Sequence, residues 1–290
     1  MSIYCVELGS FESKKGKEKM KVKDVMSGPV ITEDEDTSVT IIARDMELSE
    51  IGSVVITRED KPVGIVTDRD ISIKICAKMG TPGEVTAKGI MTSPLITIGP
   101  EAPVETACGL LAETDIRRLP VMGNDKLVGI ISVRNILTGA PEYVQRFYPA
   151  EGELVSEQLE VGDVMTLEVI TVDEDTVVSK ISKDMEESEI GGVVITRGGK
   201  PIGMVTDRDI ASKVIMADKK ASEIKAKAIM RSPLITIGPD ASVEKACGIM
   251  AAKDIRRMPV MDEDKLVGII SVRNILTRSP GHVVKFYPGE

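Results

Sequence analysis

One eight-residue pattern, Gly to Ile, occurs four times along the chain, and its spacing constrains the fold more than any other feature. The copies lie at 64–71, 129–136, 203–210 and 268–275. The step of 139 residues that separates Arg117 from Arg256 carries the first half onto the second without a gap. A step of 65 residues carries Thr67 onto Ser132 within the first half. The chain is therefore predicted to consist of four related units in two pairs.

Within the first unit, the residue pattern predicts a strand, a helix, two strands and a final helix. A first strand is expected over 29–32, and the acidic turn that follows leads to Thr37 as the helix N-cap. Apolar residues at helical spacing between Val39 and Met46 place the first helix.

The second part of the unit contains two strands and a helix. Strands are predicted over 53–57 and 62–66, and the last helix is expected to run from Thr67 to about Met79. One unit then has an α/β, β-α-β-β-α order with a small mixed sheet. Because so small a sheet cannot bury both faces alone, neighbouring units are expected to pair.

The length of 290 residues suits two domains of ordinary size. The polar, acidic stretch 150–160 is predicted to be the linker between them. The predicted divisions are a tail at 1–20, a first module at 21–150 with units 21–82 and 83–150, and a second module at 151–290 with units 160–221 and 222–290.

Charge and composition exclude several classes of function. The formal net charge of −9 argues against an extended nucleic-acid surface, and no apolar run approaches the length of a membrane span. The cysteines show no metal-type spacing, which favours buried thiols in a reducing, cytoplasmic compartment. No nucleophile–base pair, metal cluster or phosphate-binding glycine loop is evident, so we expect no enzyme activity. The four cysteines are Cys5, Cys76, Cys108 and Cys247.

Each copy of the repeated pattern places two polar residues at the turn from a strand into a helix. The first has Thr67 and Asp70, three residues apart. One interpretation is a capping box, in which the hydroxyl and the acid satisfy backbone N–H groups, and a single copy would favour it. The other is a ligand site, because unpaired N–H groups at a helix N-terminus favour anions. Four copies in a fixed context favour the second interpretation.

Taken together, the repeated features resemble the cystathionine-β-synthase (CBS) motif. They are Asp-Val-Met near the start of a unit, Val-Val-Ile in the second strand, and the Gly-x-x-Thr/Ser-x-x-Asp/Asn turn. Two such motifs in tandem resemble a Bateman module, so the chain looks like two modules. This organisation is similar to that of stand-alone archaeal CBS proteins and of the gamma regulatory subunit of AMP-activated protein kinase. The resemblance implies that an adenosyl ligand binds in clefts between paired units.

The resemblance also implies which residues bind the ligand. The Asp of the turn would accept from both ribose hydroxyls, the Thr would lie near the ribose and α-phosphate, and an Arg of the partner unit would bind phosphate. Apolar residues would hold the adenine. The first cleft would use Ile65, Thr67, Asp70, Ile96, Arg117 and Pro120. The second would use Met204, Thr206, Asp209, Ile235, Arg256 and Pro259.

Two further clefts depart from this pattern and are predicted to be weak or empty. They would use Ser132 with Asn135, and Ser271 with Asn274, so an uncharged amide replaces the carboxylate. The positions equivalent to Arg117 are glycines, Gly52 and Gly191, so the phosphate cation is missing as well.

The expected function is regulatory: a sensor of AMP, ADP or ATP, with Mg²⁺ accompanying ATP. Binding would rearrange the paired units and so change contacts with an effector protein. The resemblance also implies that the two modules assemble as a disk, either within one chain or through a homodimer. One alternative is a binder of S-adenosylmethionine or methylthioadenosine, which have no phosphates and would leave the two arginines without a role. The other is a scaffold that binds no ligand, in which the repeated turns only cap helices.

Overall fold

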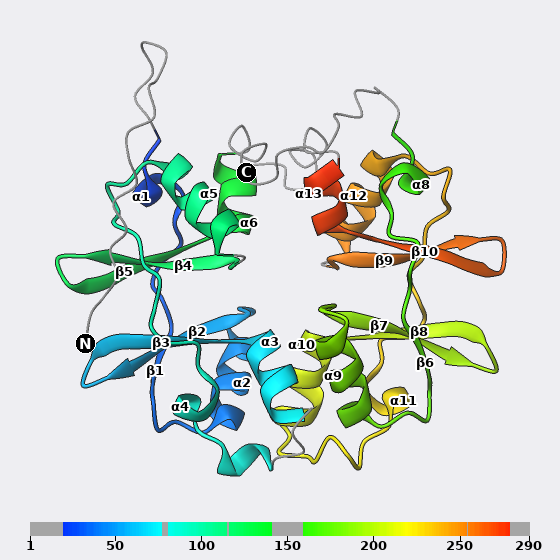
Figure 1. Cartoon of the computed structure of the whole chain (residues 1–290), viewed down its shortest axis with the longest axis horizontal. Helices are drawn as coiled ribbons and strands as arrows, with labels where there is room; N and C mark the ends of the chain where they lie inside the picture. The colour runs from blue at the N-terminus through cyan, green and yellow to red at the C-terminus, as the bar shows by residue number, and fades with distance from the viewer. Residues whose placement is uncertain (1–19, 77–80, 115, 141–158, 254, 279–290) are drawn as a thin grey trace.

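The sheets of the four units occupy the four quadrants of one body in the computed structural model, and the short first helix of each unit lies in the quadrant of its partner unit (Figure 1). The structure describes residues 20–76, 81–114, 116–140, 159–253 and 255–278. Viewed down the shortest axis, the first half of the chain lies on the left and the second half on the right. The predicted linker up to residue 158, the tail except Met20, and Met79 at the expected end of a helix lie outside the described residues.

The first unit has a three-stranded mixed sheet in the order β1-β2-β3. Strand β1 pairs in parallel with β2, and β2 pairs antiparallel with β3. Helix α2 lies between β1 and β2 in sequence, and α3 follows β3 and continues into a π-helical turn, η1. The elements are α1 (Val22–Val25), β1 (Thr32–Asp34), α2 (Val39–Leu48), β2 (Ser53–Arg58), β3 (Lys61–Thr67), α3 (Asp68–Ile71) and η1 (Ser72–Cys76).

The third unit, which is the first unit of the second half, repeats this arrangement with the sheet order β6-β7-β8. Its parallel strand β6 pairs with β7, as β1 pairs with β2. The elements are α8 (Val161–Val164), β6 (Thr171–Asp173), α9 (Val178–Glu187), β7 (Gly192–Arg197), β8 (Lys200–Thr206), α10 (Asp207–Ile210) and η4 (Ala211–Ile215).

The second and fourth units contain only a two-stranded hairpin as their sheet, β4-β5 and β10-β9. Elements of the second unit are η2 (Pro82–Glu84), α4 (Ala87–Ile90), α5 (Val104–Glu113), β4 (Arg118–Gly123), β5 (Lys126–Ser132) and α6 (Val133–Gly139). Those of the fourth are α11 (Ala226–Ile229), α12 (Val243–Ala252), β9 (Arg257–Asp262), β10 (Lys265–Ser271) and α13 (Val272–Arg278).

The expected first strand is therefore wrong for these two units, where it shrinks to the single bridges Ile98↔Val121 and Ile237↔Val260. The reason lies in two backbone donors. In the first unit the N–H of Val55 donates to the carbonyl of Ile31 at 3.2 Å, and the N–H of Glu35 donates to the carbonyl of Thr57 at 2.9 Å. Proline, which has no N–H to donate, occupies both equivalent positions: Pro120 and Pro100 in the second unit, and Pro259 and Pro239 in the fourth.

Two boundaries in the first unit also differ from the prediction. The strand lies at Thr32–Asp34 instead of 29–32, because its parallel register with β2 begins at Thr32↔Val55. The helix cap is Ser38 instead of Thr37: the Ser38 hydroxyl accepts from the N–H of Thr40, while the Thr37 hydroxyl donates to Glu33 at 3.1 Å. The strand predictions over 53–57 and 62–66 are confirmed by β2 and β3.

The two halves pack against each other within one chain. A single apolar core contains residues of both the first and the third unit, for example Ile75 of η1 and Ile181 of α9. The polar side chain of Arg69 crosses the same boundary, where its Nη1 donates to the carbonyl of Ile190 at 3.2 Å. The second and fourth units have separate cores, although Val133 packs against both. The first and third units therefore hold the halves together.

Candidate functional site

The four repeated turns share one hydrogen-bond geometry. The backbone N–H and hydroxyl of Thr67 both donate to Oδ2 of Asp70, at 3.0 and 2.6 Å, and the N–H of Asp70 donates to the Thr67 hydroxyl at 3.1 Å. This is the capping box that the sequence suggested. It uses only one carboxylate oxygen. The other, Oδ1, lies 2.7 Å from Lys74 Nζ and 3.4 Å from the hydroxyl of Thr92 in the second unit.

In the first cleft, backbone pairing connects several of the predicted residues. Ile65 and Thr92 exchange both backbone hydrogen bonds, at 3.1 and 2.9 Å, which joins β3 to the segment leading through Ile96. The N–H of Ile98 then donates to the carbonyl of Pro120 at 3.1 Å. This chain of contacts brings the edge of the first unit next to the hairpin of the second.

In the second half, the corresponding surfaces enclose a cavity, which we call the second-pair cavity. It contains about 840 Å³ of space free of protein atoms, partly open to solvent. Five predicted residues line it: Met204, Thr206, Ile235, Arg256 and Pro259. The sixth, Asp209, is fully buried behind the wall and contacts the lining residue Arg231. The other lining residues are Asp68, Arg117, Gly191, Asp207, Arg208, Arg231, Pro233, Leu234, Ile255 and Arg257.

One lining residue comes from an unexpected place. Arg117, predicted for the first cleft, lines the second-pair cavity beside Arg256, as does Asp68 of the first unit. Sequence reasoning assigned Arg117 by its repeat position within its own half, and nothing in that position indicates contact with the other half. The cavity is thus built from both halves of the chain.

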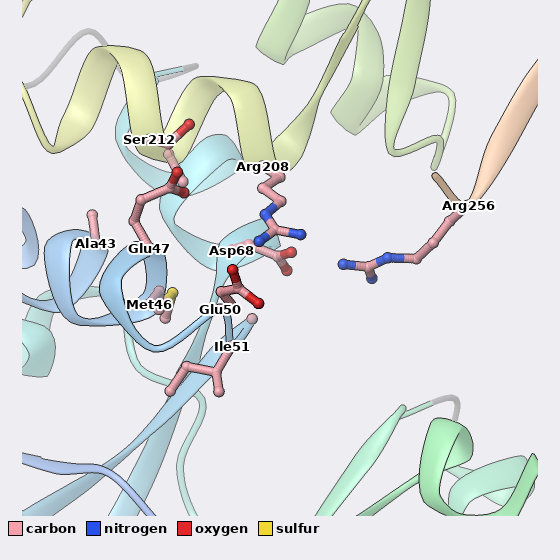
Figure 2. A pocket seen from close by; sticks show the side chains of 11 residues that line it. Ala43, Met46, Glu47, Glu50, Ile51, Asp68, Arg208, Ser212 and Arg256 are labelled. Atoms are coloured by element: carbon pink, nitrogen blue, oxygen red, sulfur yellow. The ribbon is translucent and has the colours of Figure 1, made fainter. Parts of the chain in front are cut away.

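A smaller pocket of about 340 Å³, which we call the junction pocket, shares Asp68, Arg208 and Arg256 with this cavity. Figure 2 shows Arg208 and Arg256 extending toward the carboxylate of Asp68 from different elements. Glu47 and Glu50 of the first unit lie on the acidic side of the same pocket. Arginines of the second half and carboxylates of the first therefore line one pocket.

Charged groups of both signs lie buried near this pocket. Burial raises the pKa of the Asp207 carboxyl, and the nearby Asp68 raises it further, while Arg257 opposes both effects. Oδ1 of Asp207 is buried without a hydrogen-bond partner among the described residues. Burial lowers the pKa of Arg257 to about 10 against the opposing charge of Asp207, and the neighbouring Arg117 and Arg256 lower it too.

Gly52 and Gly191 have a packing role that the sequence did not reveal. A Cβ atom on Gly52 would lie 2.7 Å from Nη2 of Arg118, and one on Gly191 would lie 2.8 Å from Nη2 of Arg257. Neither distance is compatible with ordinary packing. The two glycines leave room for interior guanidinium groups of the partner units.

The turns with asparagine already use their amide groups within the protein. Nδ2 of Asn135 donates to the hydroxyl of Ser27 at 2.7 Å, and Nδ2 of Asn274 donates to that of Thr166 at 2.9 Å. Oδ1 of each amide accepts from the capping Ser132 or Ser271. A ligand at these turns would have to compete with both contacts.

The described residues contain neither a metal-binding cluster nor a membrane-spanning helix. No group of three or more His, Cys, Asp or Glu side chains there is arranged to hold a metal ion. No helix in that part of the chain has the length and apolar character needed to cross a membrane.

Comparison with known proteins identifies the repeated unit. A model of the CBS domain matches the chain four times, over residues 22–76, 87–142, 161–215 and 226–281. The uncharacterized protein MK0525 of Methanopyrus kandleri is 38% identical over 122 residues, which cover 41% of this chain and 62% of that protein. MJ1404 of Methanocaldococcus jannaschii is 29% identical over 274 residues, which cover 88% of this chain and 61% of the relative. The chain thus spans about three fifths of each relative's length.

Solved structures share the fold. MJ1225 of Methanocaldococcus jannaschii, a proposed archaeal homolog of g-AMPK, superposes with a TM-score of 0.69 at 17% identity, over 89% of this chain and 99% of that one. An uncharacterized conserved protein of Pyrococcus horikoshii gives a TM-score of 0.50 at 21% identity, over 89% and 98%. At these sequence identities, both similarities show a shared fold.

Proposed function

Since the chain belongs to the CBS domain family, with four such domains, we propose that it is a regulatory protein that binds adenine nucleotides between paired domains. We propose two modules, at 21–150 and 151–290, in a cytoplasmic protein without enzyme activity. The observation that carries the proposal is the second-pair cavity, where Met204, Thr206 and Arg256 line one space.

The lining suggests how a nucleotide is held. The apolar side chains of Met204, Ile235 and Pro259 offer a surface for the flat adenine ring. Asp209, at the turn beside the cavity, supplies a carboxylate for the ribose diol, because one carboxylate can accept from both hydroxyls. Arg256 and Arg117 supply planar guanidinium groups that match phosphate oxygens. The equivalent cleft of the first half would use Ile65, Thr67, Asp70, Ile96 and Pro120.

The same geometry suggests how binding is signalled. Arg117 belongs to the first half and Arg256 to the second, and both line the second-pair cavity. A phosphate held by both would favour arrangements that keep the halves close, and a ligand shifts an equilibrium only through such a difference in affinity. We propose that this shift changes the surface presented to an effector protein. A homodimer and Mg²⁺ bound with ATP belong to the same proposal.

Charge favours phosphate-bearing ligands over S-adenosylmethionine or methylthioadenosine. Five arginines and two aspartates line the second-pair cavity. Such an excess of positive charge attracts an anion and disfavours the sulfonium cation of S-adenosylmethionine. A neutral thioether would leave the arginines without phosphate partners.

The test is thermal unfolding of the full chain with AMP, ADP, ATP, S-adenosylmethionine or methylthioadenosine, all at one concentration. A ligand at a hundred times its dissociation constant stabilises the folded state by about 2.7 kcal/mol. We expect stabilisation by the nucleotides that disappears in the chain carrying both Asp70→Asn and Asp209→Asn. Stabilisation mainly by the sulfur compounds would support the alternative ligand, and none by any compound would support the scaffold.

A further inference from the structure

One position in the repeat distinguishes the four clefts. It follows the methionine near the start of each unit and is occupied by Ser27, Thr92, Thr166 and Arg231. Three of these residues present a hydroxyl group to the neighbouring turn, at Asn135, Asp70 and Asn274 respectively. Only the fourth presents a cation. The two clefts that have an aspartate are therefore not equivalent.

The cation already occupies the carboxylate expected to bind ribose. Nε of Arg231 donates to Oδ1 of Asp209 at 2.8 Å, and Nζ of Lys213 lies 3.1 Å from the same oxygen. The other oxygen, Oδ2, accepts from Thr206 in the capping box. Both oxygens of Asp209 are thus in use before any ligand binds.

Solvent exposure shows the consequence of this contact. The Asp209 side chain is 0% exposed, whereas the Asp70 side chain in the first cleft is 13% exposed. The Arg231 side chain is itself 48% exposed and lines the second-pair cavity. A ribose can reach Asp209 only after Arg231 moves, and the half-exposed guanidinium has room to move into the cavity.

We infer that Arg231 makes the second cleft selective for nucleotides that carry phosphate. This inference rests on the proposed function. When the ribose diol takes Oδ1 of Asp209, the displaced guanidinium binds the phosphate carried on the 5′ carbon of the same ribose. A nucleoside without phosphate also breaks the Arg231–Asp209 contact, but it has no anionic group to which the displaced guanidinium can bind.

The loss of the Arg231–Asp209 contact and the gain of an Arg231–phosphate contact both shift selectivity toward ligands that carry phosphate. The displaced contact weakens binding of every ribose compound, and the new contact strengthens binding of charged ones only. The surroundings reinforce the gain, because Arg117 and Arg256 line the same cavity. The first cleft has Thr92 at this position, so it discriminates less by charge.

The first experiment uses the full chain with Asp70→Asn, so that only the second cleft keeps its carboxylate. Calorimetry measures the dissociation constants of adenosine, AMP and ATP, with and without Arg231→Thr. Threonine at this position is already accommodated at Thr92, where the ion pair of Asp70 with Lys74 remains. We expect Arg231→Thr to lower the preference for ATP over adenosine about tenfold, the usual effect of one hydrogen bond to a charged group.

The reciprocal experiment introduces the cation into the first cleft. In the full chain with Asp209→Asn, Thr92→Arg is expected to raise the preference for ATP over adenosine by a similar factor. An effect of either variant on stability alone would change both affinities together and leave their ratio unaltered. Unchanged ratios in both variants would overturn the inference while the proposed function stands. Failure of every adenosine compound to bind the wild-type chain would overturn both.

Discussion

Gly191 lies directly against Arg257, so closely that a Cβ atom at this glycine would be 2.8 Å from Nη2 of the arginine and 2.7 Å from Oδ2 of Asp207. The arginine belongs to the fourth unit and the other two residues to the third. The side chains of Asp207 and Arg257, which come from paired units, therefore both require a residue without a side chain at this point.

We expect Gly191→Ala to lower the free energy of unfolding by about 1–3 kcal/mol, because the added methyl overpacks an interior contact. Urea denaturation measures the change. The control is Gly248→Ala in helix α12, where a Cβ would meet no atom within 4 Å. That variant should be neutral or stabilised by about 0.5–1 kcal/mol, since alanine favours helix. Equal midpoints for the two variants would contradict the packing account.

Acid should weaken the first unit through Glu35. Its carboxylate accepts from Nε of Arg58 at 2.6 Å and from Nζ of Lys88 at 3.3 Å. Arg58, more than Lys88, lowers the pKa of Glu35 from 4.5 to about 2. Because the folded pKa is the lower one, this stabilisation is fully present above pH 4.5 and is lost as the pH falls toward 2.

Melting temperatures of wild type and Glu35→Gln should therefore converge as the pH is lowered through this window. The control is Glu113→Gln, an exposed residue at the end of α5. A difference between wild type and Glu35→Gln that stays constant down to pH 2 would rule out the ion pair as its source.

Two substitutions of Asp70 should separate its role in the helix cap from its role in ligand binding. Asp70→Ala removes the capping acceptor and is expected to lower the free energy of unfolding by about 1 kcal/mol. Asp70→Asn should retain most of the cap, because Oδ1 of Asn135 accepts from the backbone N–H of Ser132 at 2.9 Å in the second unit. Chemical denaturation without ligand gives the comparison, and equal losses in the two variants would show that the cap is not what the alanine removes.

Arg117 and Arg256 should act on phosphate and not on the nucleoside. Replacing either with glutamine is expected to weaken ATP binding about tenfold or more, as for a lost hydrogen bond to a charged group, with adenosine affinity nearly unchanged. Calorimetry of both ligands provides the measurement. Arg44→Gln on the exposed face of α2 is the control. Equal weakening of adenosine and ATP would contradict a phosphate role.

Local sequence patterns predicted the parts of the fold that depend on local chemistry. The repeat predicted four units, and short runs of β-branched residues around a polar turn predicted β2 and β3. The Thr67–Asp70 spacing predicted the capping box, whose bonds lie within four residues. These features depend on neighbours in the chain, which the sequence displays directly.

The features that sequence reasoning missed depend on distant contacts. Pro100 and Pro120 limit the strand pairing of the second unit to one bridge, and the sequence contains this signal. Arg117 lines a cavity of the other half, which depends on how the halves pack. Arg231 was detectable in the sequence, because the equivalent positions of the other units hold Ser27, Thr92 and Thr166, which carry no charge. Its contact with Asp209 could be found only from the structure.

The most direct test of the central claim is the number of adenine nucleotides bound per full-length chain, measured by calorimetric titration with ATP. We expect two bound nucleotides per chain, in the clefts of Asp70 and Asp209, and none after Asp70→Asn and Asp209→Asn are combined. Retained folding of that double variant is checked by its melting curve. Four nucleotides per chain, or unchanged binding in the folded double variant, would contradict the claim.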